Sequence, residues 1–245
     1  MLPAACVIPA YQAADSIAAV VLGVRLHAPE LVIIVIDGGS IDATFDAAVA
    51  SGADHVLRHA SNRGKGRALL TGFAHVATLI PAVVAVITMD ADGQHDPASL
   101  PAVLQALMSA DLVLGVRRRR GTSMPLLRRL ANGISTRAIA WCAGRPMRDA
   151  QCGLRGIRRS LLDRVPHVGE RYEAETGFVI RAVRAGAIIA ETEIPTRYGP
   201  ASHFRPLRDA VRVVATIWSH RPSRLPACDF SAPTTTVSSP TGSTA

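Results

Sequence analysis

The chain has 245 residues, of which 49% are hydrophobic, and its 27 Lys and Arg outnumber its 19 Asp and Glu to give a formal net charge of +8. This length and apolar content suffice for one large α/β domain or two small ones, which excludes disorder for most of the chain. The excess of arginine favours phosphate-bearing partners or an anionic membrane surface, whereas aromatic residues make up only 4% and argue against a nucleic-acid partner that stacks its bases.

Cysteine spacing and hydropathy indicate where the protein works. The four cysteines, Cys6, Cys142, Cys152 and Cys228, form neither a close pair nor a metal-binding pattern, which fits a reducing compartment. The first ten residues, MLPAACVIPA, lack the positive start of a signal peptide, and the longest apolar run is shorter than the roughly 20 residues of a spanning helix. We therefore expect a cytoplasmic protein, with any membrane contact peripheral and on the inner face.

Strand-like and helix-like runs alternate along the first half of the chain. Strands are predicted over 5–9, 31–36, 55–59, 83–89 and 111–116, and helices from about Asp15, Asp42, Lys65 and Pro97 onwards. This order is typical of an α/β fold with a doubly wound, mostly parallel sheet and helices on both faces. Ligands of such sheets collect beyond the carboxyl ends of the strands, which is where Asp37 and Asp90 lie.

The pattern changes from about Met124. Two amphipathic helices are predicted over 124–144 and 171–186, followed by a strand over 188–198 and a final helix over 206–219. The final helix carries one apolar stripe, which could lie in a membrane interface or pack on the domain itself. From residue 226 to 245 the sequence is rich in Ser, Thr and Pro and predicts a disordered tail.

The stretch VVAVITMDADGQHDP places two aspartates directly after a buried strand. If the backbone stays extended, alternate side chains lie on one side, so that Asp90, Asp92 and the amide of Gln94 converge, with Gly93 allowing the turn. Two carboxylates held that close repel each other unless a cation or donors lie between them, and Mg²⁺ or Mn²⁺ takes such oxygen ligands. The alternative is that the aspartates only cap the helix near Pro97, although a cap needs one aspartate.

Seven segments follow one another in an informative order: VIPAYQAADSI, VIDGGSIDAT, NRGKGRALLTGF, MDADGQHDP, DAQCGLRGIRR, YEAETGFVIRAVRAG and RYGPASHFRPLRD. Together they resemble the family 2 glycosyltransferases of the GT-A fold, and within them the polyprenyl-phosphate glycosyltransferases such as dolichyl-phosphate mannose and glucose synthases. The resemblance covers nearly all of the chain that we expect to be ordered. It implies one GT-A, Rossmann-like domain over 1–225, with a nucleotide-sugar half (1–116) and an acceptor half (117–225).

The resemblance implies that the first half holds the nucleotide sugar. Pro9 and Tyr11 belong to the turn that shapes the floor of the base pocket, and Lys65 lies in a glycine-rich stretch beside the nucleotide. Asp37 is the implied hydrogen-bond acceptor for the base or ribose, although it could instead serve only at the start of a helix. The family usually has a second aspartate where this chain has Gly38, so the identity of the base is left open.

The same resemblance assigns the acidic stretch to the donor. It gives Asp90 to the ribose or the metal, and Asp92 and Gln94 to the Mg²⁺ or Mn²⁺ that holds the diphosphate. Such an ion neutralises the charge that develops on the departing nucleoside diphosphate.

Acceptor residues are implied in the second half. Arg117 matches the family arginine that helps to hold the acceptor phosphate, a task that suits a planar fork of donors. Residues 118–120, also arginines, are interpreted as a solvated face. Asp149 matches the functional aspartate of the segment near the acceptor. Either Glu173 or Glu175 matches the acidic residue that faces the sugar, and we favour Glu175, because positions two apart on a helix do not share a face.

We therefore predict a metal-dependent, inverting glycosyltransferase that moves a hexose from a UDP- or GDP-sugar to a polyprenyl phosphate at the cytosolic membrane face. A phosphate monoester, with a second pKa of about 6, is mostly a dianion at pH 7 and needs arginines more than a base. A saccharide or other hydroxyl acceptor is an alternative, since Asp149 or Glu175 could act as its base. A non-catalytic nucleotide-sugar-binding protein is another, suggested by Gly38.

Overall fold

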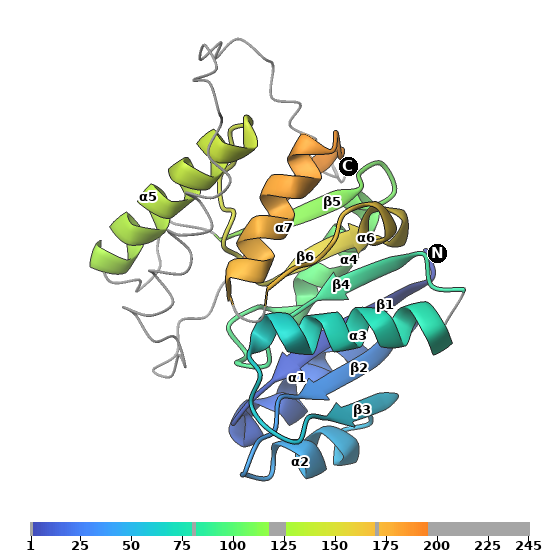
Figure 1. Cartoon of the computed structure of the whole chain (residues 1–245). Helices are drawn as coiled ribbons and strands as arrows, with labels where there is room; N and C mark the ends of the chain where they lie inside the picture. The colour runs from blue at the N-terminus through green and yellow to red at the C-terminus, as the bar shows by residue number, and fades with distance from the viewer. Residues whose placement is uncertain (1, 80–81, 118–125, 170–171, 196–245) are drawn as a thin grey trace, which may run out of the picture.

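The structure is a computed structural model that describes residues 2–79, 82–117, 126–169 and 172–195. Within these ranges one sheet of seven strands runs through the molecule in the order β3-β2-β1-β4-β6-β5-β7 (Figure 1). The strands are β1 (Ala4–Ala10), β2 (Val32–Asp37), β3 (His55–Arg58), β4 (Ala85–Thr88), β5 (Leu112–Arg117), β6 (Arg155–Arg158) and β7 (Ile189–Ile194). The predicted α/β fold with a mostly parallel sheet is confirmed.

Helices connect the strands. They are α1 (Ala14–His27), α2 (Thr44–Ala50), α3 (Lys65–Leu79), the short 3₁₀ helix η1 (Pro97–Ser99), α4 (Leu100–Ala106), α5 (Leu126–Ala143), α6 (Arg159–Arg164) and α7 (Tyr172–Arg184). The predicted starts near Asp15, Asp42, Lys65 and Pro97 lie within two residues of the observed ones. None of the helices in the described part of the chain is long and apolar enough to cross a membrane.

Strand direction is uniform except at one position. The pairs β1 with β2, β1 with β4, β2 with β3, and β5 with β7 are parallel, whereas β6 runs antiparallel to both of its neighbours, β4 and β5. Strand β6 is not among the strands expected from the sequence, because its four residues, RGIR, show neither an apolar run nor a clear alternation. It lies between β4 and β5 and so connects β5 and β7 to the rest of the sheet.

Two apolar layers cover the sheet. Helices α1 and α4 pack on one face, with Ile17, Val21 and Leu104 among the buried residues, and α3, α6 and α7 pack on the other, with Leu69 and Phe178 (Figure 1). The central strands are buried on both faces, which explains why their sequences are continuous apolar runs. Because both faces are covered, polar side chains are left to gather at the ends of the strands.

The acidic stretch does not continue β4 as an extended strand. Strand β4 ends at Thr88, and residues 91–93 form a turn in which Gly93 has a φ of +70°. The expected alternation of side chains beyond the strand is therefore wrong for this segment, and the turn itself brings the carboxylates together. The role of capping the next helix falls to Asp96, whose side chain accepts a hydrogen bond from the Ala98 N–H at 3.0 Å.

Two expectations lie outside the described residues. These are the final amphipathic helix over 206–219 and the tail over 226–245. The strand expected over 188–198 is described as β7 up to its end at Ile194.

Candidate active site

The centre of the site is the Asp90 carboxylate, two residues beyond the end of β4. Lys65 Nζ, from the first residue of α3, lies 2.6 Å from Asp90 Oδ1. His95 Nε2 lies 3.5 Å from Asp90 Oδ2. Two basic side chains from different segments therefore face this one carboxylate at the carboxyl edge of the sheet.

Lys65 also reaches the second half of the chain. Its Nζ lies 2.9 Å from Glu175 Oε2, in the first turn of α7; Glu175 is buried and Lys65 is half-buried. Helices α3 and α7 begin close together on the same face of the sheet (Figure 1). Glu175 is only 5% exposed, whereas Glu173 is half-buried on the other side of the turn, so Glu175 is the glutamate that faces Asp90 across Lys65.

The charges in this cluster are set by mutual contact. Burial alone would raise the pKa of Asp90, but Lys65 and His95 hold it well below its ordinary value. Burial also disfavours charge on His95, yet Cys152 and Asp90 raise its pKa to about 10. Desolvation and the negative charge of Asp90 raise the pKa of Asp92. Asp90 is therefore compensated by two cations, whereas ionised Asp92 carries a cost that an added cation would relieve.

The oxygen ligands available at this turn fit a divalent cation that binds together with a phosphate group. In the part of the chain that the structure describes, no group of three or more His, Cys, Asp or Glu side chains could hold a metal by itself. Asp90 and Asp92 supply two carboxylates, and Gln94 belongs to the same turn, where its backbone N–H donates to Asp92 Oδ1 at 3.0 Å. Mg²⁺ commonly binds one or two carboxylates and completes its shell with water and substrate phosphates.

Gly153 lets the loop before β6 pack against the end of β4. A Cβ atom at Gly153 would lie 2.2 Å from Asp90 Oδ2, so any side chain there would displace the carboxylate. Thr88 Oγ1 donates to the Gly153 carbonyl at 2.9 Å and fixes the loop against the end of β4. This contact exists because β6 pairs antiparallel with β4. In the sequence, the segment QCGLR is the motif from which the contact could have been predicted.

Arg155 anchors the same loop from inside. It is 3% exposed and donates hydrogen bonds to the backbone carbonyls of Cys152 at 2.9 Å, Glu175 at 3.0 Å and Ala150 at 3.2 Å. Its guanidinium also lies 3.8 Å from Glu175 Oε1. Arg155 and His95 are functional candidates that the sequence interpretation missed, because the pattern does not show the contact of Arg155 with Glu175, 20 residues away, or that of His95 with Cys152, 57 residues away.

Arg117 and Asp149 form a second ionic unit. Arg117 Nε and one terminal nitrogen donate to the two Asp149 oxygens at 2.7 and 3.0 Å, and the Gln151 N–H donates to Asp149 at 3.1 Å. Asp149 is 3% exposed, and although burial would raise its pKa, the bonds from Arg117 lower it. A carboxylate with a lowered pKa is a weak base, so Asp149 is better suited to hold the guanidinium than to take a proton.

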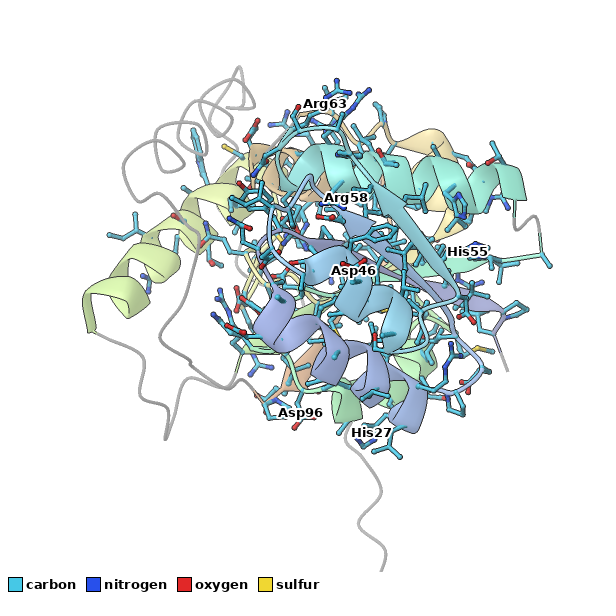
Figure 2. The ribbon with its side chains drawn as sticks, turned by 90° about the horizontal axis from the view of Figure 1, so that it is seen from below. His27, Asp46, His55, Arg58, Arg63 and Asp96 are labelled. Atoms are coloured by element: carbon cyan, nitrogen blue, oxygen red, sulfur yellow. The ribbon has the colours of Figure 1, made fainter. Side chains whose placement is uncertain are left out.

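Asp37 is the last residue of β2. It is fully buried, accepts a hydrogen bond from the Ser40 N–H at 2.9 Å and pairs with Arg58 Nε at 3.1 Å. Figure 2 shows Arg58 beside α2, on the side of the molecule that also carries Arg63. The contact of Asp37 with a base or ribose stays a prediction, and in this structure its carboxylate faces Ser40 and Arg58.

The floor of the predicted base pocket is formed by the ends of β1 and β2. Pro9 is half-buried and Tyr11 is 36% exposed, while the Gly38 N–H donates to the Ala10 carbonyl at 2.7 Å. A Cβ atom at Gly38 would lie 3.7 Å from Tyr11 Cβ. It would also lie 3.3 Å from the Ala10 carbonyl oxygen and 3.8 Å from Tyr11 Cδ2, so a side chain at this position would touch the end of β1 and the Tyr11 ring.

The predicted site residues fall into three groups. Lys65, Asp90 and Glu175 are joined by direct ion pairs, with Asp92 beside Asp90. The pair Arg117–Asp149 is connected to them through the loop that Arg155 holds. Asp37 belongs to a separate pair with Arg58.

Comparisons with known proteins identify the family of this chain. The model of the glycosyl transferase family 2 matches residues 5–165. An undecaprenyl-phosphate mannosyltransferase of Micrococcus luteus is 30% identical over 200 residues, which cover 77% of this chain and 81% of that protein. An undecaprenyl-phosphate 4-deoxy-4-formamido-L-arabinose transferase of Klebsiella pneumoniae is 35% identical over 173 residues, covering 66% of this chain and 50% of that protein.

A solved structure shares the fold. It is the glucosyl-3-phosphoglycerate synthase of Mycobacterium tuberculosis in complex with Mn²⁺, UDP and phosphoglyceric acid. It superimposes with a TM-score of 0.67 and 25% sequence identity over 90% of this chain and 80% of that one.

Proposed function

Because this chain belongs to the glycosyl transferase family 2 and is a glycosyltransferase, we propose that it moves a hexose from a UDP- or GDP-sugar to a polyprenyl phosphate, with inversion at the anomeric carbon. The reaction would take place at the cytosolic membrane face, where the protein would bind peripherally. The observation that carries the proposal is the acidic pair Asp90 and Asp92 at the carboxyl edge of the sheet, faced by Lys65 and joined through it to the acceptor half.

In the proposed donor site, the diphosphate lies between the acidic turn and the start of α3. Asp90 and Asp92 would hold Mg²⁺ or Mn²⁺, with Gln94 in the same turn, and the ion would supply charge neutralisation at the diphosphate. Pro9 and Tyr11 would support the base. The Mn²⁺ and UDP of the solved relative support this assignment.

The groups around the proposed acceptor site favour a phosphate over a hydroxyl. A hydroxyl acceptor must lose a proton to a base, but Asp149 is bonded twice by Arg117, and Glu175 is paired with Lys65 and Arg155. A phosphate monoester arrives ionised, with a second pKa of about 6, and attacks without deprotonation. The undecaprenyl-phosphate transferases among the relatives support the same choice of acceptor.

Arg117 is the proposed contact to the acceptor phosphate, and Asp149 is the residue that positions it. The bidentate pair fixes the plane of the guanidinium at the end of β5. A guanidinium fixed in this way binds a phosphate with less loss of side-chain freedom than a mobile one. Glu175 would act at a distance from the acceptor, by holding Lys65.

The experiment is release of nucleoside diphosphate from UDP- and GDP-hexoses with Mg²⁺ or Mn²⁺ and undecaprenyl phosphate in detergent. Parallel reactions offer 3-phosphoglycerate or a simple glycoside, because the solved relative was captured with phosphoglyceric acid. We expect turnover with the lipid phosphate. Faster turnover with either hydroxyl acceptor would replace the proposed acceptor, and an absence of turnover across the full panel of donors and acceptors would reject the proposal.

A further inference from the structure

Lys65 is the only lysine among the 27 Lys and Arg residues of the chain, and the other 26 are arginines. It stands at the point where the donor and acceptor halves meet. The ammonium is a compact charge on a flexible stem, whereas the guanidinium is a planar fork that locks into fixed geometry. The single use of lysine at this position indicates that the site requires a small cation that can move.

The ammonium is shared between two carboxylates. Its nitrogen lies 2.6 Å from Asp90 Oδ1 and 2.9 Å from Glu175 Oε2, and the Lys65 side chain is 15% exposed. Glu175 is held in turn by Arg155. Although burial opposes the charge, Asp90 and Glu175 raise the pKa of Lys65, so it is an ammonium at any physiological pH.

This position conflicts with the proposed cation site. A divalent ion bound by Asp90 and Asp92 would compete for a carboxylate that Lys65 already contacts, and two cations on one carboxylate repel each other. Glu175 offers Lys65 a second anchor on α7, which does not depend on Asp90. The ammonium can therefore leave Asp90 without leaving the site.

We propose that Lys65 is an exchangeable counter-ion of Asp90, displaced when a divalent cation and a nucleoside diphosphate bind together, and retained by Glu175 where it faces the diphosphate. This inference rests on the proposed function. Lys65 blocks binding of the cation alone and favours binding of the cation with the nucleotide, whose negative charge compensates both positive groups. Lys65 is thus a positioning residue that makes cation binding conditional on the donor.

The decisive measurement is the affinity of the whole chain for Mn²⁺, followed by electron paramagnetic resonance without any turnover. In Lys65→Met, removal of the competing ammonium should tighten Mn²⁺ binding in the absence of nucleotide by about tenfold or more, while UDP and GDP bind more weakly with Mn²⁺ present. The control is Arg67→Met, which removes one positive charge two residues along the same helix, on another face. It should change Mn²⁺ affinity much less.

Glu175→Gln should change the Mn²⁺ affinity in the opposite direction to Lys65→Met. Without its second anchor the ammonium stays on Asp90, so Mn²⁺ should bind more weakly than to the native chain, both alone and with nucleotide. The double variant Lys65→Met with Glu175→Gln removes one positive and one negative charge and guards against misfolding of Lys65→Met. It should again bind Mn²⁺ alone more tightly than the native chain does.

A spectroscopic signal reports the movement directly. Because the chain has a single lysine, biosynthetic labelling with lysine that carries ¹³C only at Cε gives one side-chain carbon resonance, from residue 65. It should shift with Mg²⁺ and UDP or GDP together, and much less with Mg²⁺ alone.

The outcomes separate the two proposals. Unchanged or weaker Mn²⁺ binding in both Lys65→Met and the double variant, with normal nucleotide-dependent Mn²⁺ binding in the native chain, overturns only the role of Lys65. Failure of the native chain to bind Mn²⁺ even with UDP or GDP overturns the proposed cation site, and the counter-ion role with it.

Discussion

Gly153 lies directly against the Asp90 carboxylate, where an added Cβ would come within 2.2 Å of Oδ2 and 2.6 Å of Cγ. Residues that are 63 positions apart in the sequence thus share one surface, and the absence of a side chain at Gly153 is part of the geometry of the candidate site. The contact also means that Asp90 can be displaced by a substitution in the loop before β6.

Gly153→Ala should therefore lower transferase turnover by about a hundredfold, because a displacement of the order of 1 Å at a reacting site costs that much. The rate of nucleoside diphosphate release measures it. Gly133→Ala is the matched control, because the nearest atom to a Cβ there is an Arg137 nitrogen at 3.9 Å. Equal turnover in the two variants would show that Asp90 tolerates displacement and is not needed in its present position.

Asp92→Ala should abolish the effect of divalent cations on nucleotide affinity while the fold is retained. Removing this carboxylate leaves Asp90 as the only carboxylate of the predicted cation site, already paired with Lys65. Calorimetric titration of UDP and GDP with and without Mn²⁺ is the measurement, and circular dichroism checks the fold. Asp46→Ala, an exposed aspartate on α2 (Figure 2), is the control and should behave as the native chain. A cation dependence that survives in Asp92→Ala contradicts the site.

Arg117→Met should raise the KM for the acceptor and also destabilise the fold. Breaking a buried pair leaves Asp149 as an uncompensated carboxylate, at a cost of about 3–5 kcal/mol. Because Arg117 lowers the pKa of Asp149 below 3.8, the pair stabilises the native state at neutral pH, and this contribution is lost as the pH falls through the lowered pKa. The stability deficit of the variant should therefore shrink in acid, as urea unfolding at pH 7 and at about pH 2.5 would show.

The double variant Arg117→Met with Asp149→Asn separates the two effects. It should regain stability at pH 7, because no buried carboxylate is left unpaired, yet keep the raised acceptor KM. Recovery of the KM together with stability would mean that Arg117 serves the fold and does not contact the acceptor.

His167 should make the protein less stable as the pH falls below about 6.5. It lies between the rings of Phe73 and Phe178, and burial, with the charges of Arg155, Arg181 and Lys65, lowers its pKa to about 3. Between these two pKa values the unfolded chain binds a proton that the folded chain does not, so folding stability decreases towards acid by up to about 1.4 kcal/mol per pH unit.

His167→Phe should flatten this dependence. Phenylalanine keeps the aromatic packing and removes the titrating group, so its free energy of unfolding should vary less between pH 7 and pH 4.5 than that of the native chain. Unfolding curves of both proteins at these two pH values are the measurement. Parallel slopes would show that His167 is protonated in the folded state.

The parts of the fold that could be read from the sequence are those with strong local patterns. The apolar runs of β1, β2, β4 and β5 predict strands because both of their faces are covered, and they mark where the polar edge of the sheet lies. Strand β6 has no such pattern. Its burial depends on neighbours from distant segments, as at Gly156, where a Cβ would lie 2.7 Å from Leu107 Cδ1.

The candidate site shows the same division. Asp90, Lys65 and Glu175 could each be chosen from a motif, but their shared contact depends on helix starts that are 107 residues apart. The buried position of Asp37 depends on Arg58, which only the β2–β3 register brings alongside. Partners of this kind are set by tertiary packing, and a local pattern does not contain them.

The antiparallel strand β6 also governs the order in which the protein can be assembled. Strands β1 to β4 emerge from the ribosome first and can pair among themselves, but the outer side of β4 has no partner until β6 has been synthesised. Strand β5 is made earlier than β6 yet joins the sheet only through it. A nascent chain that has not reached residue 155 therefore has an unpaired apolar strand edge at β4, the kind of edge that promotes aggregation until it is covered.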